Sequence, residues 1–243
     1  MKRKTLPNGV FRMEKQTEAD FDVFASAWLH SVPTEIVRLI HPISEIIEYK
    51  NKDTIYALGG PQEYLWGVVG GRVNVLVAMS EMDPVLGHVH HPGAWFGESE
   101  VIHGIDGLVE MKAVGVTRVA RVPYAAFRKH ANSHPSLWEA FARLTSMNQL
   151  LAMSAANDLA LRTSRQRLAA TLLRLSGKRG VLQGSRPADT VRASQQDIAT
   201  LANVSASKAS AHLGTMANEG LIRLEYAQVA ILNEAKLLEV IEG

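Results

Sequence analysis

Residues 194–222 read SQQDIATLANVSASKASAHLGTMANEGLI, and this stretch decides the fold of the C-terminal part of the chain. Ser194, followed three residues later by Asp197, is the pattern of a helix N-terminus in which each side chain caps the other residue's backbone N–H. We expect a short helix there, a turn at 203–205 and a second helix over 206–218. Two short helices joined by a tight turn predict a helix-turn-helix.

Two runs of β-forming residues follow the second helix, at 221–224 and 229–232, separated by the turn 225–228. A hairpin at this place makes the unit a winged helix-turn-helix. Because a further helix is expected over 164–176, we assign residues 164–243 to one domain. The residues expected to form its core are Ile198, Leu201, Val204, Ala209, Leu213 and Leu221.

The segment 135–162 carries the strongest helix pattern, and we assign residues 133–163 to dimerisation. Pro135 stands at a first helical position, where its missing N–H costs nothing. A seam recurs at steps of four and three residues, as in a two-helix coiled coil. We expect a homodimer through this helix, although the same seam could pack on the chain's own N-terminal domain. The seam consists of Leu137, Phe141, Leu144, Asn148, Leu151, Ala155 and Asp158.

Residues 1–132 hold short β-rich runs separated by Gly and Pro, a spacing that predicts a barrel or a sandwich. The runs lie at 53–56, 65–69, 72–77 and 114–122. A helix is expected over 11–40, because apolar residues recur there at steps of three and four. These residues are Phe21, Phe24, Trp28 and Val32.

The composition is that of a soluble globular protein. Of the 243 residues 47% are hydrophobic and 21% charged, and there is no apolar run of about 18 residues such as a membrane span needs. The basic N-terminus lacks the apolar core of a signal peptide, so we expect a cytoplasmic protein without a membrane partner. The chain contains no cysteine, which excludes an iron–sulfur cluster held by cysteine thiolates.

The net charge of +2 is unevenly distributed. Residues 162–243 hold eleven Lys or Arg and seven Asp or Glu, a net charge of +4. Clustered cations are typical of proteins that neutralise DNA phosphates, although ordinary scatter of charge explains this excess equally well.

Four stretches of the chain resemble the Crp–Fnr family of regulators, whose best-known member is the cyclic-AMP receptor protein. They are Gly59-Gly60 to Gly70-Gly71-Arg72-Val73, Pro92-Gly93-Ala94-Trp95-Phe96-Gly97-Glu98, the hinge Ser164-Arg165-Gln166-Arg167-Leu168, and Ser194-Gln195-Gln196-Asp197-Ile198-Ala199 continuing to Glu219-Gly220-Leu221-Ile222. The resemblance implies an α+β fold: an N-terminal cyclic-nucleotide-binding-type β-barrel (jelly roll), a long dimerisation helix and a C-terminal winged helix-turn-helix.

The same resemblance implies a sequence-specific transcriptional regulator, not an enzyme, that binds double-stranded DNA as a homodimer. A two-fold symmetric dimer implies a near-palindromic operator with half-sites about 10 base pairs apart. RNA polymerase is a further candidate partner.

The resemblance places helix 206–218 in the major groove, but its residues depart from the cyclic-AMP receptor pattern. The Arg-Glu-x-x-x-Arg set of that protein falls on Ala206, Ser207 and Ala211, so Arg-to-guanine contacts are missing and a different operator is expected. Lys208 could contact a base or a phosphate. The expected DNA-binding residues are Ser194, Ser205, Ala206, Ser207, Lys208, Ser210, Ala211 and His212.

The expected effector pocket departs from the family as well. The Arg-Ser pair that holds the cyclic phosphate falls on Gly107 and Leu108, and the Thr-Ser pair that reads adenine falls on Ala152 and Met153. A buried phosphate without charge-assisted hydrogen bonds is costly, so we expect a small apolar effector, or none, in place of cyclic AMP. The expected pocket residues are Gly97, Glu98, Gly107, Leu108, Met111, Ala152 and Met153.

Two other functions stay open at this point. His88, His90 and His91, with Glu98, have the chemistry of a metal site and would fit a metal-dependent cupin-like enzyme. Glu98 follows His90 by eight residues, which is longer than the gap in a cupin motif, so we expect no metal. A protein-interaction module that has lost DNA binding would explain the missing arginines, and its binding would depend weakly on salt.

Overall fold

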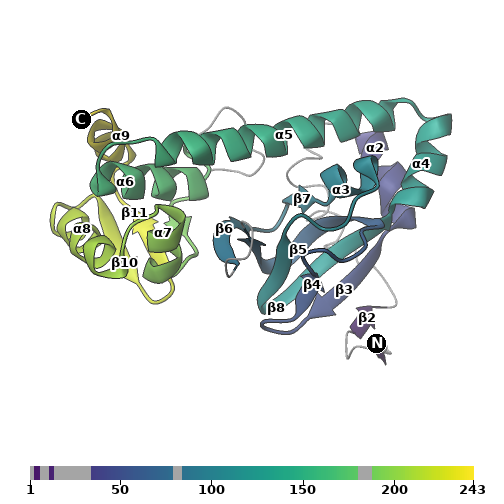
Figure 1. Cartoon of the computed structure of the whole chain (residues 1–243), viewed down its shortest axis with the longest axis horizontal. Helices are drawn as coiled ribbons and strands as arrows, with labels where there is room; N and C mark the ends of the chain where they lie inside the picture. Colours follow the sequence, from purple (N-terminus) through teal and green to yellow (C-terminus); the bar gives the residue numbers. More distant parts are fainter. Residues whose placement is uncertain (1–2, 6–10, 14–33, 79–83, 180–187) are drawn as a thin grey trace. The chain divides into compact units, whose positions relative to one another are not determined.

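The computed structural model describes residues 3–5, 11–13, 34–78, 84–179 and 188–243. Figure 1 shows a region rich in β-strands, the long helix α5 (Ser136–Leu159) and a smaller region of helices with a β-hairpin. The chain divides into two compact units, Met1–Asn148 and Gln149–Gly243, so the division falls inside α5. The three-part division that the sequence suggests, with limits at 132 and 163, stays a prediction.

Within the described residues, an eight-stranded sheet forms the first unit. Its order is β1-β2-β3-β8-β5-β6, with β4 on β8 and β7 on β5. The strands are β1 (Arg3–Thr5), β2 (Phe11–Met13), β3 (Glu45–Tyr49), β4 (Thr54–Tyr56), β5 (Tyr64–Val77), β6 (Val85–His90), β7 (Trp95–Phe96) and β8 (Glu110–Pro123).

The two predicted strands at 65–69 and 72–77 are one continuous strand, β5. It pairs antiparallel with β8, and the register shifts on both sides of Gly70. Such irregularities bend and twist a strand pair without ending it. The Gly70-Gly71 pair, which lies between the two predicted runs, is therefore a bend within one strand and does not separate two strands.

Among the described residues of this unit, four helices and a 3-10 helix accompany the sheet. They are α2 (Thr34–Ile40), η2 (His41–Ile43), α3 (Glu98–His103), α4 (Tyr124–Ser133) and the first part of α5. The prediction of a helix over 11–40 is right for 34–40 and wrong for 11–13. Those three residues form β2, because Phe11 and Arg12 pair with Glu48 and Ile47 of β3, and tertiary pairing overrides a local pattern. Phe21, Phe24, Trp28 and Val32 lie outside the described residues.

The first half of the predicted dimer seam is a core element of its own unit. Leu137, Phe141 and Leu144 are fully buried in one apolar cluster with residues of α2 and α4. The ring centroids of Phe127 in α4 and Phe141 in α5 lie 5.4 Å apart. The alternative of a helix packed on its own domain is thus correct for this half of α5, because α2 and α4 already cover that face.

The second unit has the predicted winged helix-turn-helix. Its elements are α6 (Ser164–Leu175), β9 (Thr190–Val191), α7 (Gln195–Leu201), α8 (Ala206–Asn218), β10 (Ile222–Glu225), β11 (Gln228–Ile231) and α9 (Glu234–Glu242). Five of the six predicted core residues are buried, and the sixth, Val204, is partly buried and packs against this core. None of the described helices is both long enough and apolar enough to span a lipid bilayer.

Helix α9 was not predicted, although the sequence holds a signal for it. The Asn233 side chain accepts a hydrogen bond from the Lys236 backbone N–H (3.0 Å), which is an N-terminal cap. Leu237 and Ile241, four residues apart, are buried in the core of the unit. A capping residue followed by this spacing indicates a helix.

Candidate nucleic-acid interface and sensory region

The start of α7 is fixed by reciprocal caps. The Ser194 hydroxyl accepts a hydrogen bond from the Asp197 N–H (3.1 Å), and the Asp197 carboxylate accepts one from the Ser194 N–H (3.0 Å). The Ser194 hydroxyl also donates to the same carboxylate (2.7 Å). The Ser194 hydroxyl is therefore engaged in the cap. A contact of this helix N-terminus with a DNA phosphate, made through backbone N–H groups, stays a prediction.

The turn between α7 and α8 is held by Arg167, a residue that sequence reasoning did not single out. Asn203 has a left-handed φ of 50°, which short polar side chains tolerate. Arg167 donates from Nε to the Ala202 carbonyl (3.0 Å) and from Nη1 to the Leu161 carbonyl (3.1 Å). One guanidinium thus joins the segment before α6 to the turn of the helix-turn-helix.

Helix α8 presents one face to the core and one to the surroundings. Ala209, Leu213 and Met216 are buried. The opposite face is exposed and built from short side chains with one cation. It contains Ala206, Ser207, Lys208, Ser210 and Ala211, while His212 is half-buried.

The N-terminal end of α8 is not capped by a side chain. Ser205 is its N-cap residue and is exposed, but its hydroxyl makes no capping hydrogen bond. The first N–H groups of a helix need partners from outside the helix, and together with the helix dipole they attract anions. This end of α8 is therefore suited to a phosphate group.

The hairpin of β10 and β11 ends in a two-residue turn. Glu225 pairs with Gln228, and between them Tyr226 is almost fully exposed while Ala227 has a φ of 52°. Arg223 donates from Nε to Glu225 (2.7 Å).

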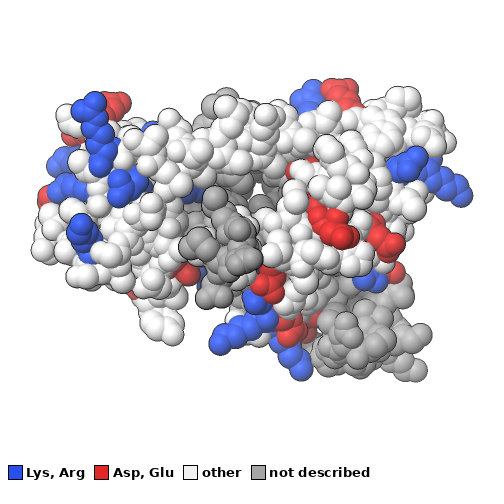
Figure 2. All heavy atoms as spheres, viewed as in Figure 1, with Lys and Arg blue, Asp and Glu red and all other residues white. Residues whose placement is uncertain are grey.

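In the view of Figure 2, Lys and Arg side chains outnumber acidic ones on the second unit, in line with the net positive charge of its sequence.

In the first unit, Glu98 is a buried carboxyl at the start of α3. It follows Gly97, whose φ of 89° lies in the left-handed region. Asn148 of α5 donates from Nδ2 to Glu98 Oε1 (2.8 Å) and to the Trp95 carbonyl (3.0 Å). Burial raises the pKa of Glu98, and the hydrogen bond from Asn148 partly opposes this shift. Asn148, expected at a dimer seam, thus joins α5 to β7 and to the start of α3 in its own chain.

The positions expected to hold a cyclic phosphate do not fit one. Gly107 donates its N–H to the Gly60 carbonyl (2.8 Å), and a Cβ there would lie 2.7 Å from the Ala57 oxygen. The Leu108 side chain is 57% exposed, and its N–H donates to the buried Glu100 (3.4 Å). Neither residue offers a charged donor, and the neighbouring carboxyl would repel an anion.

The remaining pocket residues are not brought together by the described contacts. Met111 is buried in the apolar cluster inside the sheet. Ala152 and Met153 belong to the second unit and are exposed on α5. The effector pocket therefore stays a prediction.

The histidines of β6 make ring contacts. The rings of His88 and His90 lie 5.0 Å apart edge to face, and the His90 ring stacks on Phe96 at 5.0 Å. Among the described residues, no three His, Asp or Glu side chains are grouped so that they could hold a metal ion. His90 packs as an aromatic side chain in the sheet interior, and the expected absence of a metal stays a prediction.

We expect His90 to destabilise the first unit in acid. Burial lowers its pKa from 6.5 to about 4, so below pH 6.5 the unfolded chain binds a proton that the folded chain does not. Stability is lost as pH falls through this window, by about 3 kcal/mol in total. Denaturant unfolding at several pH values, compared between the wild type and His90→Phe, measures the effect.

The difference in unfolding free energy between the wild type and His90→Phe should be constant above about pH 7. It should shift in favour of His90→Phe between pH 6.5 and about 4. His103→Gln changes an exposed histidine and serves as the control. A difference that is independent of pH would show that His90 is protonated in the folded protein as readily as in the unfolded chain.

Two family models match the chain. A model of the cyclic nucleotide-binding domain matches residues 46–134, and a model of the Crp-like helix-turn-helix domain matches residues 166–240. The first covers most of the sheet with α3 and α4, and the second covers most of α6 to α9.

Relatives and solved structures match along most of the chain. It is 26% identical over 218 residues to the transcriptional regulatory protein btr of Bordetella pertussis, with 85% of each chain covered. It is 24% identical over 203 residues to the transcriptional regulator SdrP of Thermus thermophilus, covering 83% of this chain and 96% of that one. The structure of FixK2 from Bradyrhizobium japonicum has a similar fold, with a TM-score of 0.70, 21% identity, and 82% and 97% of the two chains covered.

Both of these relatives are transcriptional regulators. The two family matches follow one another along the chain in the order that the sequence predicts. The chain is thus a member of the Crp–Fnr family of transcriptional regulators, with a helix-turn-helix DNA-binding domain in its C-terminal part.

Proposed function

We propose that this regulator binds a near-palindromic operator as a homodimer and reads its bases with α8. The observation that carries the proposal is the exposed face of α8, where short side chains surround Lys208 and the uncapped helix start. Short side chains let a helix approach the base edges closely, and alanine methyl groups suit contact with thymine methyl groups. Guanine readout by paired arginines is not part of this interface.

The second half of α5 supplies a surface for a second copy of the chain. Met153 and Leu159 are 59% and 47% exposed, and Ala152 and Ala156 are exposed beside them. Ala152, Ala156 and Leu159 follow steps of four and three, which place them on one helix face. An exposed apolar stripe of this kind suits a parallel helix pair, and it differs from the seam predicted from the sequence.

The first unit would then act on α5 through Glu98 and Asn148. A ligand or a charge change at Glu98 alters the carboxyl that accepts the hydrogen bond from Asn148 (2.8 Å). The effector, if one acts here, is a molecule other than cyclic AMP, because Gly107 and Leu108 cannot hold a cyclic phosphate.

The proposal is tested by selecting bound sequences from random duplex DNA with the purified full-length chain. We expect enrichment of a two-fold symmetric motif. Lys208→Ala should weaken binding to this motif by about three- to tenfold. It should also reduce the steepness of the fall of log affinity with log salt by about two, because the dimer loses one phosphate contact in each copy. Binding is measured by fluorescence anisotropy at several salt concentrations.

Lys236→Ala is the matched control, because Lys236 is exposed on α9 of the same unit. It should leave both the affinity and the salt slope close to those of the wild type. Enrichment of no motif, or of a motif without two-fold symmetry, would contradict the proposed function. An unchanged salt slope in Lys208→Ala would mean that this side chain does not contact a phosphate.

A further inference from the structure

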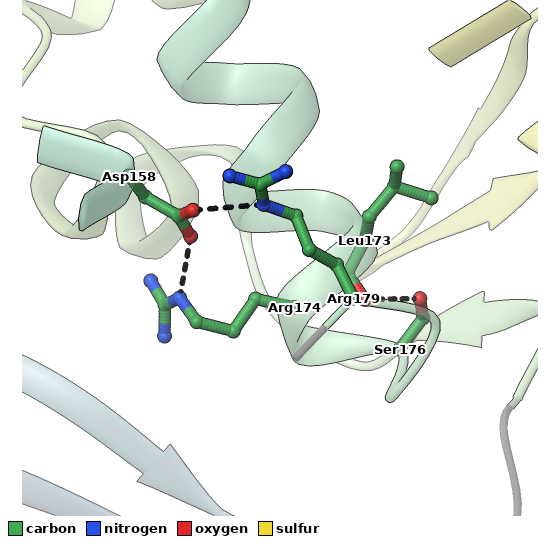
Figure 3. Close-up of polar contacts among 5 residues, drawn as sticks. All are labelled: Asp158, Leu173, Arg174, Ser176 and Arg179. Atoms are coloured by element: carbon green, nitrogen blue, oxygen red, sulfur yellow. Dashed lines mark hydrogen bonds and ion pairs between the residues drawn. The ribbon is translucent and has the colours of Figure 1, made fainter. Parts of the chain in front are cut away.

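A buried ion cluster lies where α5 ends. Asp158, in the last turn of α5, accepts hydrogen bonds from two arginines (Figure 3). Its Oδ2 accepts from Arg174 Nε (2.8 Å) and its Oδ1 from Arg179 Nε (3.0 Å). Arg174 belongs to the last turn of α6, and Arg179 lies four residues beyond that helix. One carboxylate therefore ties the end of α5 to the end of α6 and to the segment after it.

The burial of this cluster makes it a rigid link. The side chains of Asp158 and Arg174 are 1% and 2% exposed, and that of Arg179 is 21% exposed. Losing one partner of a buried pair leaves an uncompensated charge in the interior, so the contact is rarely broken. Arg143 and Glu139 form an ion pair on the same helix with both side chains more than half exposed, where water competes for the charges.

The cluster joins α5 to the body that carries the recognition helix. Leu168 and Leu172 of α6 are fully buried in the same apolar cluster as Leu213 of α8. Because Asp158 holds α6, the last turns of α5 and helix α8 belong to one packed body. This body is the compact unit 149–243, which also carries the exposed stripe with Met153 and Leu159.

We propose that Asp158 is a positioning residue that sets the distance between the two operator half-sites. The proposal rests on the proposed function, a homodimer formed through α5. In such a dimer the paired α5 helices fix the position of one copy relative to the other. The Asp158 cluster fixes each α8 relative to its own α5. The distance between the two recognition helices then follows from one rigid link in each copy, and the operator spacing matches that distance.

The experiment compares operator duplexes of different spacing, using the full-length chain and the selected motif. Wild-type protein should bind the selected spacing at least about tenfold more tightly than a duplex with about two extra base pairs between the half-sites. With Asp158→Asn this preference should fall to about threefold or less, while affinity for a duplex with one half-site scrambled stays the same. Glu139→Gln, which removes the exposed pair, should keep the wild-type preference.

The two expected readouts separate positioning from simple loss of stability. A destabilised domain would lose affinity for full and half operators alike and would keep its spacing preference. Melting temperature and sedimentation establish that each variant is a folded dimer under the assay conditions. Arg179→Met removes the less buried partner of Asp158. If Asp158→Asn does not fold, Arg179→Met should show the same loss of spacing preference in smaller measure.

A spacing preference that is unchanged in both folded variants overturns the inference and leaves the proposed function intact. Failure of the wild type to bind any two-fold symmetric duplex is a failure of the proposed function itself.

Discussion

Replacing Gly71 by alanine is expected to lower the unfolding free energy of the first unit by about 3 kcal/mol or more. Gly71 has a φ of 79°, and an added Cβ would lie 2.5 Å from the Val116 carbonyl oxygen and 2.7 Å from the Thr117 Cα. Left-handed backbone costs a non-glycine residue about 1–2 kcal/mol, and the clash is with backbone atoms that cannot rotate away. The bend in β5, where this strand pairs with β8, would have to open to make room for the methyl group.

Urea unfolding followed by tryptophan fluorescence measures this loss, because all four tryptophans lie within the unit Met1–Asn148. Two neighbouring glycines provide controls. At Gly70 a Cβ meets no atom within 4 Å and φ is ordinary, so alanine should be nearly neutral. At Gly115 the space is equally open but φ is 70°, so alanine should cost only about 1 kcal/mol. Equal losses at all three positions would contradict the described bend.

Ala211→Glu is expected to reduce operator affinity by about 100-fold, because like charges held together at an interface cost several kcal/mol. Ala211 is exposed on the same face of α8 as Ser207 and Lys208, so in the proposed interface the new carboxylate would point towards the phosphates and base edges. Glutamate is a good helix former, and the stability of the second unit should change little. Anisotropy titrations with the selected operator measure the affinity.

Ala235→Glu makes the same substitution at an exposed position of α9, outside the proposed interface. Its affinity should stay within about threefold of the wild type, since a distant exposed charge is screened by salt. Equal effects of the two variants would mean that the total charge of the unit, and not the face of α8, decides DNA binding.

The helix-turn-helix could be predicted closely because its signals are local. The predicted limits of α8, 206–218, agree with the structure, and the Ser194 cap marks the start of α7 as expected. The hairpin strands are shifted by one residue from the predicted runs. Caps, turn residues and helical spacing act within a few residues of one another, so a sequence displays them directly.

The partner of an apolar face could not be predicted in the same way. The spacing of Leu137, Phe141 and Leu144 requires that something covers them, but it does not distinguish a second chain from α2 and α4. The contacts of Asn148 with Glu98, of Arg167 with Ala202, and of Asp158 with Arg174 have no local pattern either. Such contacts depend on how whole elements pack against one another, which no local pattern displays.

In the proposed interface, the short side chains on the exposed face of α8 also determine the thermodynamics of recognition. Alanine has no rotamers to lose and serine has few, so ordering this surface against DNA costs little conformational entropy. With few long side chains to adapt to a mismatched base, discrimination depends on how closely the groove follows the helix. Operators should therefore differ in affinity through the width and deformability of their DNA as much as through individual base contacts.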